Sequence, residues 1–265
     1  MQRKHYQWDA SEYERHSAAQ LQWAGELIAK LHLKGHETVL DLGCGDGKVT
    51  AAIAALLPEG HVLGIDNSGQ MIQLAKRRHS GANLSFELLD IRDLNWTERF
   101  DVVFSNAVLH WIKRHLPVLM RVHKALKTGG RMLLQMGGSG NARDVVSVMD
   151  QLIRNKWSQH FKGFTFPYGF YGAQDYTGWL VQAGFEPLRV ELLSKDMQHR
   201  DRHALAGWIR STWLPYLERI PDRQTEPFIT AVVDEYLYHH PPDDEGIIHV
   251  AMVRLEVEAV KSYQG

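Results

Sequence analysis

The 265-residue sequence has a single cysteine, no excess of either charge and no apolar run that approaches the roughly 18–20 residues of a membrane span. One cysteine, Cys44, excludes a disulfide framework and a cysteine-rich zinc site. Thirty lysine and arginine residues stand against 31 aspartate and glutamate residues, and the net charge of −1 argues against a nucleic-acid-binding protein. Residues 1–9 lack the apolar core that a signal peptide needs. We therefore expect a soluble, cytoplasmic protein.

Strand-like and helix-like segments alternate along the first half of the chain. The patterns predict strands over residues 38–42, 61–66, 84–89, 100–105 and 131–136 and helices over residues 48–57, 69–78 and 115–127. Strands that alternate with helices of about 10–15 residues indicate parallel βαβ units. Such units build an open, doubly wound α/β sheet.

The last third of the chain has a different pattern. A helix is predicted over residues 173–183 and strands over residues 185–193 and 248–260. Between these two strands, residues 195–245 are rich in Trp, Tyr, His and Arg. We expect them to form a helical cap over the ligand edge of the sheet.

The expected organisation is one domain over residues 1–265. Apolar residues at three- and four-residue spacing predict that residues 1–35 form an N-terminal helical lid. The predicted cofactor-binding core then spans residues 36–136.

A glycine-rich loop, residues 43–47, follows the first predicted strand. Glycines let a ligand approach the backbone where a side chain would block it. Dinucleotide-binding loops have the spacing G-x-G-x-x-G, and here the third glycine comes one residue earlier. Asp41 and Asp46 would also repel a pyrophosphate. The loop therefore favours S-adenosylmethionine, whose ammonium and sulfonium groups are cationic.

Asp66 ends the second predicted strand, 19 residues after Gly47. A carboxylate in this position can accept hydrogen bonds from both hydroxyls of a ribose. The alternative role for Asp66 is to cap the helix that follows it.

Together these motifs resemble those of the class I S-adenosylmethionine-dependent methyltransferases over residues 38–136. The resemblance implies a Rossmann-like sheet of seven strands, the last antiparallel, with S-adenosylmethionine as cofactor and S-adenosylhomocysteine as product. It implies cofactor contacts from Asp41, Gly43, Cys44, Gly45, Asp66, Asn67, Met71, Asp90, Ile91 and Asn106. In this family the segment that matches residues 106–111 faces the transferred methyl group.

The nature of the methyl acceptor decides whether a base is needed. A hydroxyl or amine must lose a proton, whereas a carboxylate, with an ordinary pKa near 4, is already ionised at neutral pH. A carboxylate needs neutral hydrogen-bond donors to orient it, and the indole of Trp111 and the amide of Gln20 supply such donors. His110 is the alternative, as a general base on a protonated acceptor.

The N-terminal motif Trp8, Tyr13 and residues 16–18, together with Trp111, is similar to that of small-carboxylate O-methyltransferases of the trans-aconitate, juvenile-hormone-acid and malonyl-carrier-protein types. This resemblance implies that Gln20 and Trp111 hold the carboxylate. The trans-aconitate type has an arginine near the position of Gln20, and this chain has none between Arg15 and Arg77. The departure argues against a tricarboxylate acceptor.

The predicted site therefore has catalytic residues Gln20, His110 and Trp111 and acceptor-binding residues Trp8, Tyr13, Trp111, Arg210 and Trp213. No metal is expected, because His199 and His203 lack the glutamate of an H-E-x-x-H motif. The expected partner is a small-molecule acceptor, with no nucleic acid, and the chain is expected to be a monomer or homodimer. Two alternatives stay open: a base-assisted C- or O-methyltransferase on a quinone- or phenol-like acceptor, and a non-catalytic S-adenosylmethionine-binding protein.

Overall fold

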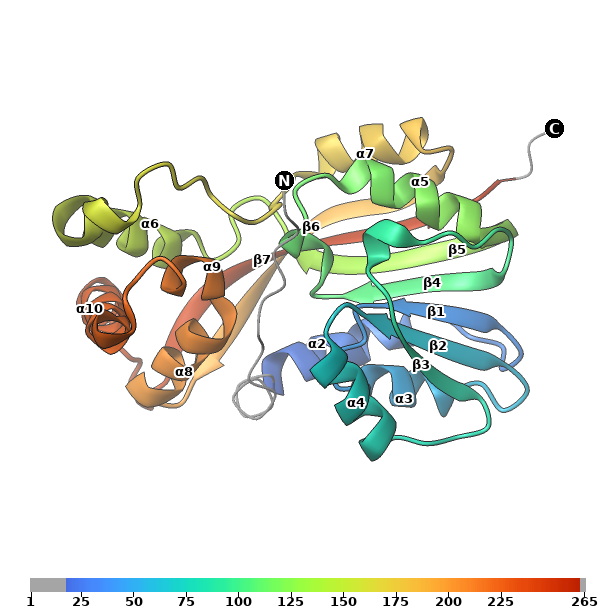
Figure 1. The fold of residues 1–265 in the computed structure, drawn as a ribbon, viewed down its shortest axis with the longest axis horizontal. Helices are drawn as coiled ribbons and strands as arrows, with labels where there is room; N and C mark the ends of the chain where they lie inside the picture. Colours follow the sequence, from blue (N-terminus) through green and yellow to red (C-terminus); the bar gives the residue numbers. More distant parts are fainter. Residues whose placement is uncertain (1–17, 263–265) are drawn as a thin grey trace.

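The computed structural model describes residues 18–262, and the side chains from residue 23 onward (Figure 1). The strands are β1 (Thr38–Leu42), β2 (His61–Asp66), β3 (Leu84–Leu88), β4 (Phe100–Asn106), β5 (Leu126–Gly137), β6 (Glu186–His199) and β7 (Ile248–Val260). They form one sheet in the order β3-β2-β1-β4-β5-β7-β6. β7 runs antiparallel to both of its neighbours, while β1 to β5 are parallel. The predicted doubly wound, seven-stranded α/β class is confirmed.

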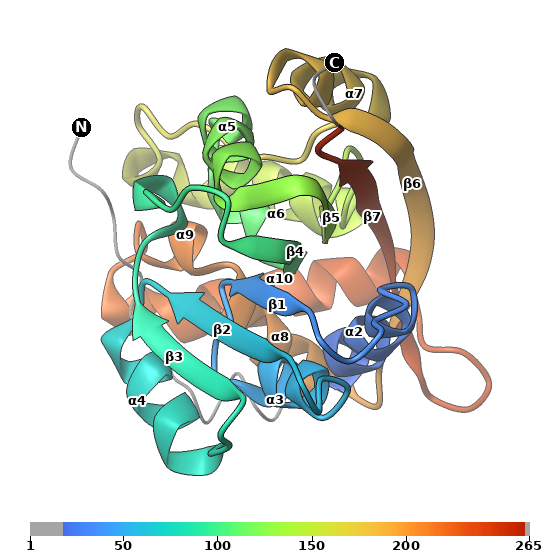
Figure 2. The ribbon, with the colours of Figure 1, turned by 90° about the vertical axis from the view of Figure 1, so that its right-hand side faces the viewer.

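Helices cover both faces of the sheet (Figure 2). The helices are α2 (Ala18–Ala29), α3 (Lys48–Ala54), α4 (Gly69–Arg78), α5 (His115–Ala125), α6 (Arg143–Leu152), α7 (Ala173–Gln182), α8 (Arg202–Thr212), α9 (Leu214–Leu217) and α10 (Asp222–His239). α2, α3 and α4 lie on one face, where Leu27 and Leu31 are fully buried with Phe104 of β4. α5 and α7 lie on the other, where Val122 and Tyr176 pack in the same core. The buried strands are apolar on both faces because both are covered.

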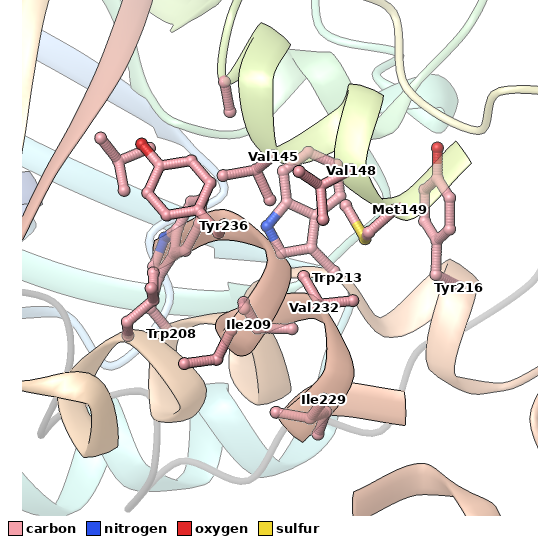
Figure 3. Close-up of a cluster of buried hydrophobic side chains, with 14 of the residues drawn as sticks. Val145, Val148, Met149, Trp208, Ile209, Trp213, Tyr216, Ile229, Val232 and Tyr236 are labelled. Carbon is pink, nitrogen blue, oxygen red and sulfur yellow. The ribbon is translucent and has the colours of Figure 1, made fainter. Parts of the chain in front are cut away.

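A helical cap lies beyond the carboxyl ends of β4 and β5 (Figure 1). α8, α9 and α10 are inserted between β6 and β7, as predicted, and α6 joins them directly after β5. The cap has its own core, in which Val145, Val148 and Met149 of α6 meet side chains of the inserted helices (Figure 3). β6 and β7 continue as a two-stranded ribbon from the end of β5 into this cap, as far as the pair His199 and Ile248.

Several predicted boundaries were wrong. β5 begins at Leu126, within the segment predicted as helix 115–127, because Leu126 pairs with Phe100 of β4 and residues 129 and 130 pair with Lys261. β6 extends to His199, so residues 195–199 belong to the sheet and not to the cap. α3 ends at Ala54 where a helix to residue 57 was expected, and α6 was not predicted.

In the part of the chain that the structure describes, every helix is too short or too polar to cross a membrane.

Candidate cofactor and acceptor site

The glycine-rich loop connects β1 to α3 and folds back onto β2. The backbone N–H groups of Gly43 and Cys44 both donate to the carbonyl of Ile65, at 2.8 and 2.9 Å. Gly45 has a φ of +54°, and a Cβ atom placed on it would meet nothing within 4 Å. The loop therefore presents bare backbone to open space at the carboxyl edge of the sheet, as a ligand-binding loop requires.

Asp66 lies at the end of β2 and is held by this loop. Its Oδ2 accepts a hydrogen bond from the Gly45 N–H at 3.1 Å, and its Oδ1 accepts from the Ser68 N–H at 2.8 Å. Ser68, and not Asp66, is the N-cap of α4 and accepts from the Met71 N–H. A carboxylate has about four acceptor positions, so Asp66 retains capacity for the hydroxyls of a ligand.

Three carboxylates line the carboxyl ends of β1, β2 and β3. Burial raises the pKa of Asp41 to about 7, despite the Thr50 hydroxyl that donates to it at 2.7 Å. Burial also raises the pKa of Asp66, and the charge of Asp90 adds to that effect. This half of the site favours a cationic ligand, because a nearby positive charge would relieve the cost of ionising buried carboxylates.

The other predicted cofactor residues lie in the segments that follow β1, β2 and β3. Asp90 caps a short 3-10 helix and is held by the guanidinium of Arg92 at 2.5 Å. Met71 and Ile91 are buried, while Asn67 is exposed. Burial raises the pKa of the Cys44 thiol above its ordinary value, so Cys44 is a packed thiol and not a nucleophile.

His110 and Trp111 lie on a 3-10 turn (Leu109–Trp111) directly after β4. His110 is buried, and its Nδ1 accepts a hydrogen bond from the backbone N–H of Gly137 at 3.3 Å. Burial, reinforced by the charge of Arg254, lowers the pKa of His110 well below its ordinary value. The ring is therefore neutral at pH 7, and an acceptor Nδ1 leaves the proton on Nε2.

An aromatic wall extends from this turn into the cap. Tyr168 stands edge-on to Trp111 at 5.1 Å and to Trp213 at 5.3 Å, and it stacks on Phe170 at 5.3 Å. Its hydroxyl donates to the carbonyl of Thr212 at 2.9 Å, which attaches the wall to the end of α8. The sequence interpretation missed Tyr168 and Phe170, although the aromatic run over residues 164–171 was a usable signal.

The structure brings only some of the predicted acceptor residues together. Trp213 is buried within the cap core, where it makes edge contact with Tyr168. Arg210 forms two hydrogen bonds with Glu226, at 2.9 and 2.8 Å, that join α8 to α10. Trp8 and Tyr13 lie outside the described residues, and Gln20 lies in α2 with its side chain outside the description. Within residues 18–262, no group of three His, Cys, Asp or Glu side chains is placed to hold a metal ion.

Comparison with known proteins agrees with this geometry. Residues 33–184 match the family model described as a methyltransferase domain. A methyltransferase of Schizosaccharomyces pombe is 34% identical over 195 residues, which are 71% of this chain and 74% of that protein. Trans-aconitate 2-methyltransferase of Methylobacterium radiotolerans is 30% identical over 96% of this chain and 98% of its own length.

A solved structure shares the fold. Phosphoethanolamine N-methyltransferase 2 of Haemonchus contortus, in complex with S-adenosylhomocysteine, has a TM-score of 0.62 and 19% identity, over 96% of this chain and 57% of that chain. The loop, the acidic edge and the family match lead to one conclusion: the chain belongs to the class I S-adenosylmethionine-dependent methyltransferases.

Proposed function

We propose that this enzyme methylates a free carboxylate of a small molecule. When bound, S-adenosylmethionine supplies an electrophilic methyl group on a sulfonium. In the proposed arrangement Asp66 accepts hydrogen bonds from the ribose hydroxyls, Gly43, Cys44 and Gly45 lie along the methionyl part, and Asp41 provides negative charge nearby. The bare backbone at Gly45 and the cluster of carboxylates support this fit.

The observation that carries the carboxylate assignment is the state of His110. A general base needs a nitrogen lone pair that is free to take a proton. The Nδ1 lone pair of His110 is engaged by the Gly137 N–H, and Nε2 carries the proton. His110 thus offers an N–H donor to an acceptor oxygen and has no basic nitrogen for a hydroxyl or a carbon acid. An acceptor that arrives already ionised fits this site, and a carboxylate is such an acceptor.

Trp111 and Gln20 complete the proposed acceptor site. The indole N–H of Trp111 is a donor only, and its ring lies on the aromatic wall with Tyr168. Gln20 lies in α2 one turn before Trp23. The proposed role of both side chains is to orient the carboxylate oxygen toward the methyl group while the wall excludes water.

The relatives support the same class of acceptor. Several of them are named trans-aconitate 2-methyltransferase, with identities of 25 to 30%. The absence of arginine between Arg15 and Arg77 still argues for an acceptor with fewer negative charges than trans-aconitate.

The direct test is release of S-adenosylhomocysteine in the presence of matched acceptors. Phenylacetate, phenol, phenethylamine and trans-aconitate offer a monocarboxylate, a hydroxyl, an amine and a tricarboxylate. We expect turnover with carboxylates and a methyl ester as product, identified by mass spectrometry. Turnover with the phenol or amine alone would contradict the proposal.

A further inference from the structure

Arg254 of β7 is a buried cation to which the proposed function assigns no role. Its side chain is 3% exposed, and its Cζ lies over the indole of Trp23 in α2, 5.4 Å from the ring centroid. In the ladder between β5 and β7, Arg254 is directly opposite Gly137. Directly opposed residues of an antiparallel pair project to the same face of the sheet, so Arg254 projects from the face that α2 covers.

This position is next to the proposed acceptor site. Gly137, the partner of Arg254, is the residue whose N–H binds Nδ1 of His110. A Cβ atom on Gly137 would lie 2.6 Å from Cε1 of Phe170, so the ring of Phe170 covers the face from which Arg254 projects. Phe170 and His110 are in turn 5.9 Å apart, centroid to centroid. Arg254, His110 and the aromatic wall therefore meet at the carboxyl end of β5.

Charges of opposite sign lie in the two halves of the site. Glu256 lies two residues further along β7 on the same face, and its Oε1 pairs with Lys30 at 2.6 Å and with Arg189. His115 is neutral at pH 7, because burial lowers its pKa to about 4. Asp41 and Asp66 of β1 and β2, and Asp90 just after β3, lie at the far side. The cofactor half is thus acidic, and the acceptor half holds a buried guanidinium.

We propose that Arg254 determines specificity for anionic acceptors. Its guanidinium attracts a carboxylate into the space beside His110 and disfavours an amine, which arrives as an ammonium. This inference rests on the proposed function, since the attracted group is the one that is methylated. In the transfer a carboxylate lone pair forms the new O–C bond, the C–S bond breaks and its electron pair remains on sulfur. The ester that results is neutral, so the same guanidinium no longer retains it.

The test compares three ligands with the same phenylethyl carbon skeleton, on the complex with S-adenosylhomocysteine. Phenylacetate, phenylacetamide and phenethylamine are anionic, neutral and cationic at pH 7.5. Binding is measured by calorimetry for wild type, Arg254→Met, Arg254→Lys and the control Lys195→Met, which removes a cation of β6 that pairs with Glu26. Wild type is expected to prefer phenylacetate to phenylacetamide by roughly 10- to 100-fold, the strength of hydrogen bonding to a charged group.

Arg254→Met should abolish that preference, while Arg254→Lys and Lys195→Met should keep it. A second readout is the titration of His110 followed by NMR, with Arg254, His115 and Tyr168 as the charged or titratable groups that face it. The pKa of His110 should rise in Arg254→Met and stay low in Arg254→Lys. This titration tests the position of Arg254 even if Arg254→Met binds no ligand. Equal preference in wild type and Arg254→Met, or a wild type without preference, overturns the inference.

The two proposals fail separately. Methylation of carboxylates with no effect of Arg254→Met would leave the proposed function standing and refute the role of Arg254. A charge preference that disappears in Arg254→Met, without methylation of any carboxylate, would refute the proposed function and retain Arg254 as the anion-recognition residue.

Discussion

A Cβ atom placed on Gly43 would lie 2.3 Å from Cγ2 of Val108. Gly43 begins the cofactor loop, and Val108 precedes the turn that holds His110 and Trp111. The side chain of Val108 therefore occupies the space that a side chain at position 43 would need. The loop after β1 and the turn after β4 are fixed against each other at this point.

We expect Gly43→Ala to lower the free energy of unfolding by on the order of 3 kcal/mol. The backbone of Gly43 has a φ of +74°, which costs a non-glycine residue about 1–2 kcal/mol. Overpacking against Val108 adds about 1–3 kcal/mol. Urea unfolding measures the loss. Adding Val108→Ala to Gly43→Ala should recover the free energy lost to overpacking but not the free energy lost to the backbone. A double variant no more stable than Gly43→Ala would show that the contact with Val108 does not cause the loss.

Gly45→Ala should affect ligand binding more than folding. Its φ is +54°, but a Cβ atom there meets nothing within 4 Å. We expect a loss of about 1 kcal/mol in stability, the cost of the left-handed backbone alone. The affinity for S-adenosylhomocysteine should fall at least about tenfold, because the methyl group enters the space proposed for the ligand. Undiminished affinity would place the cofactor elsewhere.

Binding of S-adenosylmethionine is expected to release protons near pH 7. Burial raises the pKa of Asp41 to about 7, so roughly half of the free protein holds a proton there at that pH. A cationic ligand lowers that pKa, so its affinity should rise between pH 6 and 8. Calorimetry in buffers of different ionisation enthalpy counts the released proton. The Asp41→Asn variant should release no proton on binding. Equal proton release from the variant and the wild type would exclude Asp41 as the source of the proton.

Asp66→Asn should weaken S-adenosylhomocysteine binding by about 1.5–3 kcal/mol, the value of hydrogen bonds to a charged group. The substitution keeps the volume of Asp66 and removes its charge. Asp46→Asn is the matched control, since Asp46 lies in the same loop but pairs with Lys48 and Arg78 at its rim. Equal effects of the two variants would mean that loop charge, and not the ribose contact, controls affinity.

At saturating S-adenosylmethionine, kcat should be nearly independent of pH from about 6 to 9, because the acceptor arrives ionised and no protein base takes part. Trp111→Phe and Gln20→Leu each remove donors and should lower kcat/KM on the order of 10- to 100-fold. Trp96→Phe, at the opposite end of β4 beside Phe100, is the control and should be silent. A rate that rises with one ionisation near pH 6–7 and vanishes in His110→Gln would instead support the base-assisted alternative.

Glu256→Gln should destabilise the protein at pH 7 by about 3 kcal/mol, because Lys30 and Arg189 would lose their shared carboxylate. Although burial alone raises it, the hydrogen bonds from Lys30, Arg189 and Gln135 hold the pKa of Glu256 below its ordinary value. A depressed carboxyl pKa stabilises the fold above the unfolded pKa and loses this effect as the pH falls through the folded value. The gap between variant and wild type should therefore narrow below about pH 4. Glu258→Gln, whose carboxylate is more exposed, should cost less than about 1 kcal/mol.

Local pattern was sufficient for much of the fold. The predicted bounds of β1, β2, α4 and β7 match the structure. In β7, buried Leu255 and Val257 alternate with charged residues, and α4 begins after a serine cap. Each of these signals acts within a few residues of the element that it sets, so the sequence alone could reveal it.

Features that depend on distant partners were not predictable in the same way. The first part of β5 joins the sheet through Lys261, and the polar end of β6 is a strand because β7 pairs with it. Arg254 and Phe170 come together through strand register and not through spacing in the sequence. α6 is the exception, since Val145, Val148 and Met149 have the spacing of an amphipathic helix and this signal is local.

The two-stranded ribbon of β6 and β7 connects the cap to the rest of the sheet. α6 leaves the sheet after Gly137, and α8 to α10 are inserted where the ribbon ends, so the cap is attached at one side of the sheet. Asp41, Gly45 and Asp66 lie at the ends of β1 and β2, which are not part of this attachment. A change in the twist of this ribbon would move the cap relative to the sheet. The acceptor space would then widen or narrow, while the cofactor-binding residues would stay in place. Exchange of residues 138–172 and 200–247 between relatives should therefore change the acceptor and leave the cofactor-binding residues unaltered.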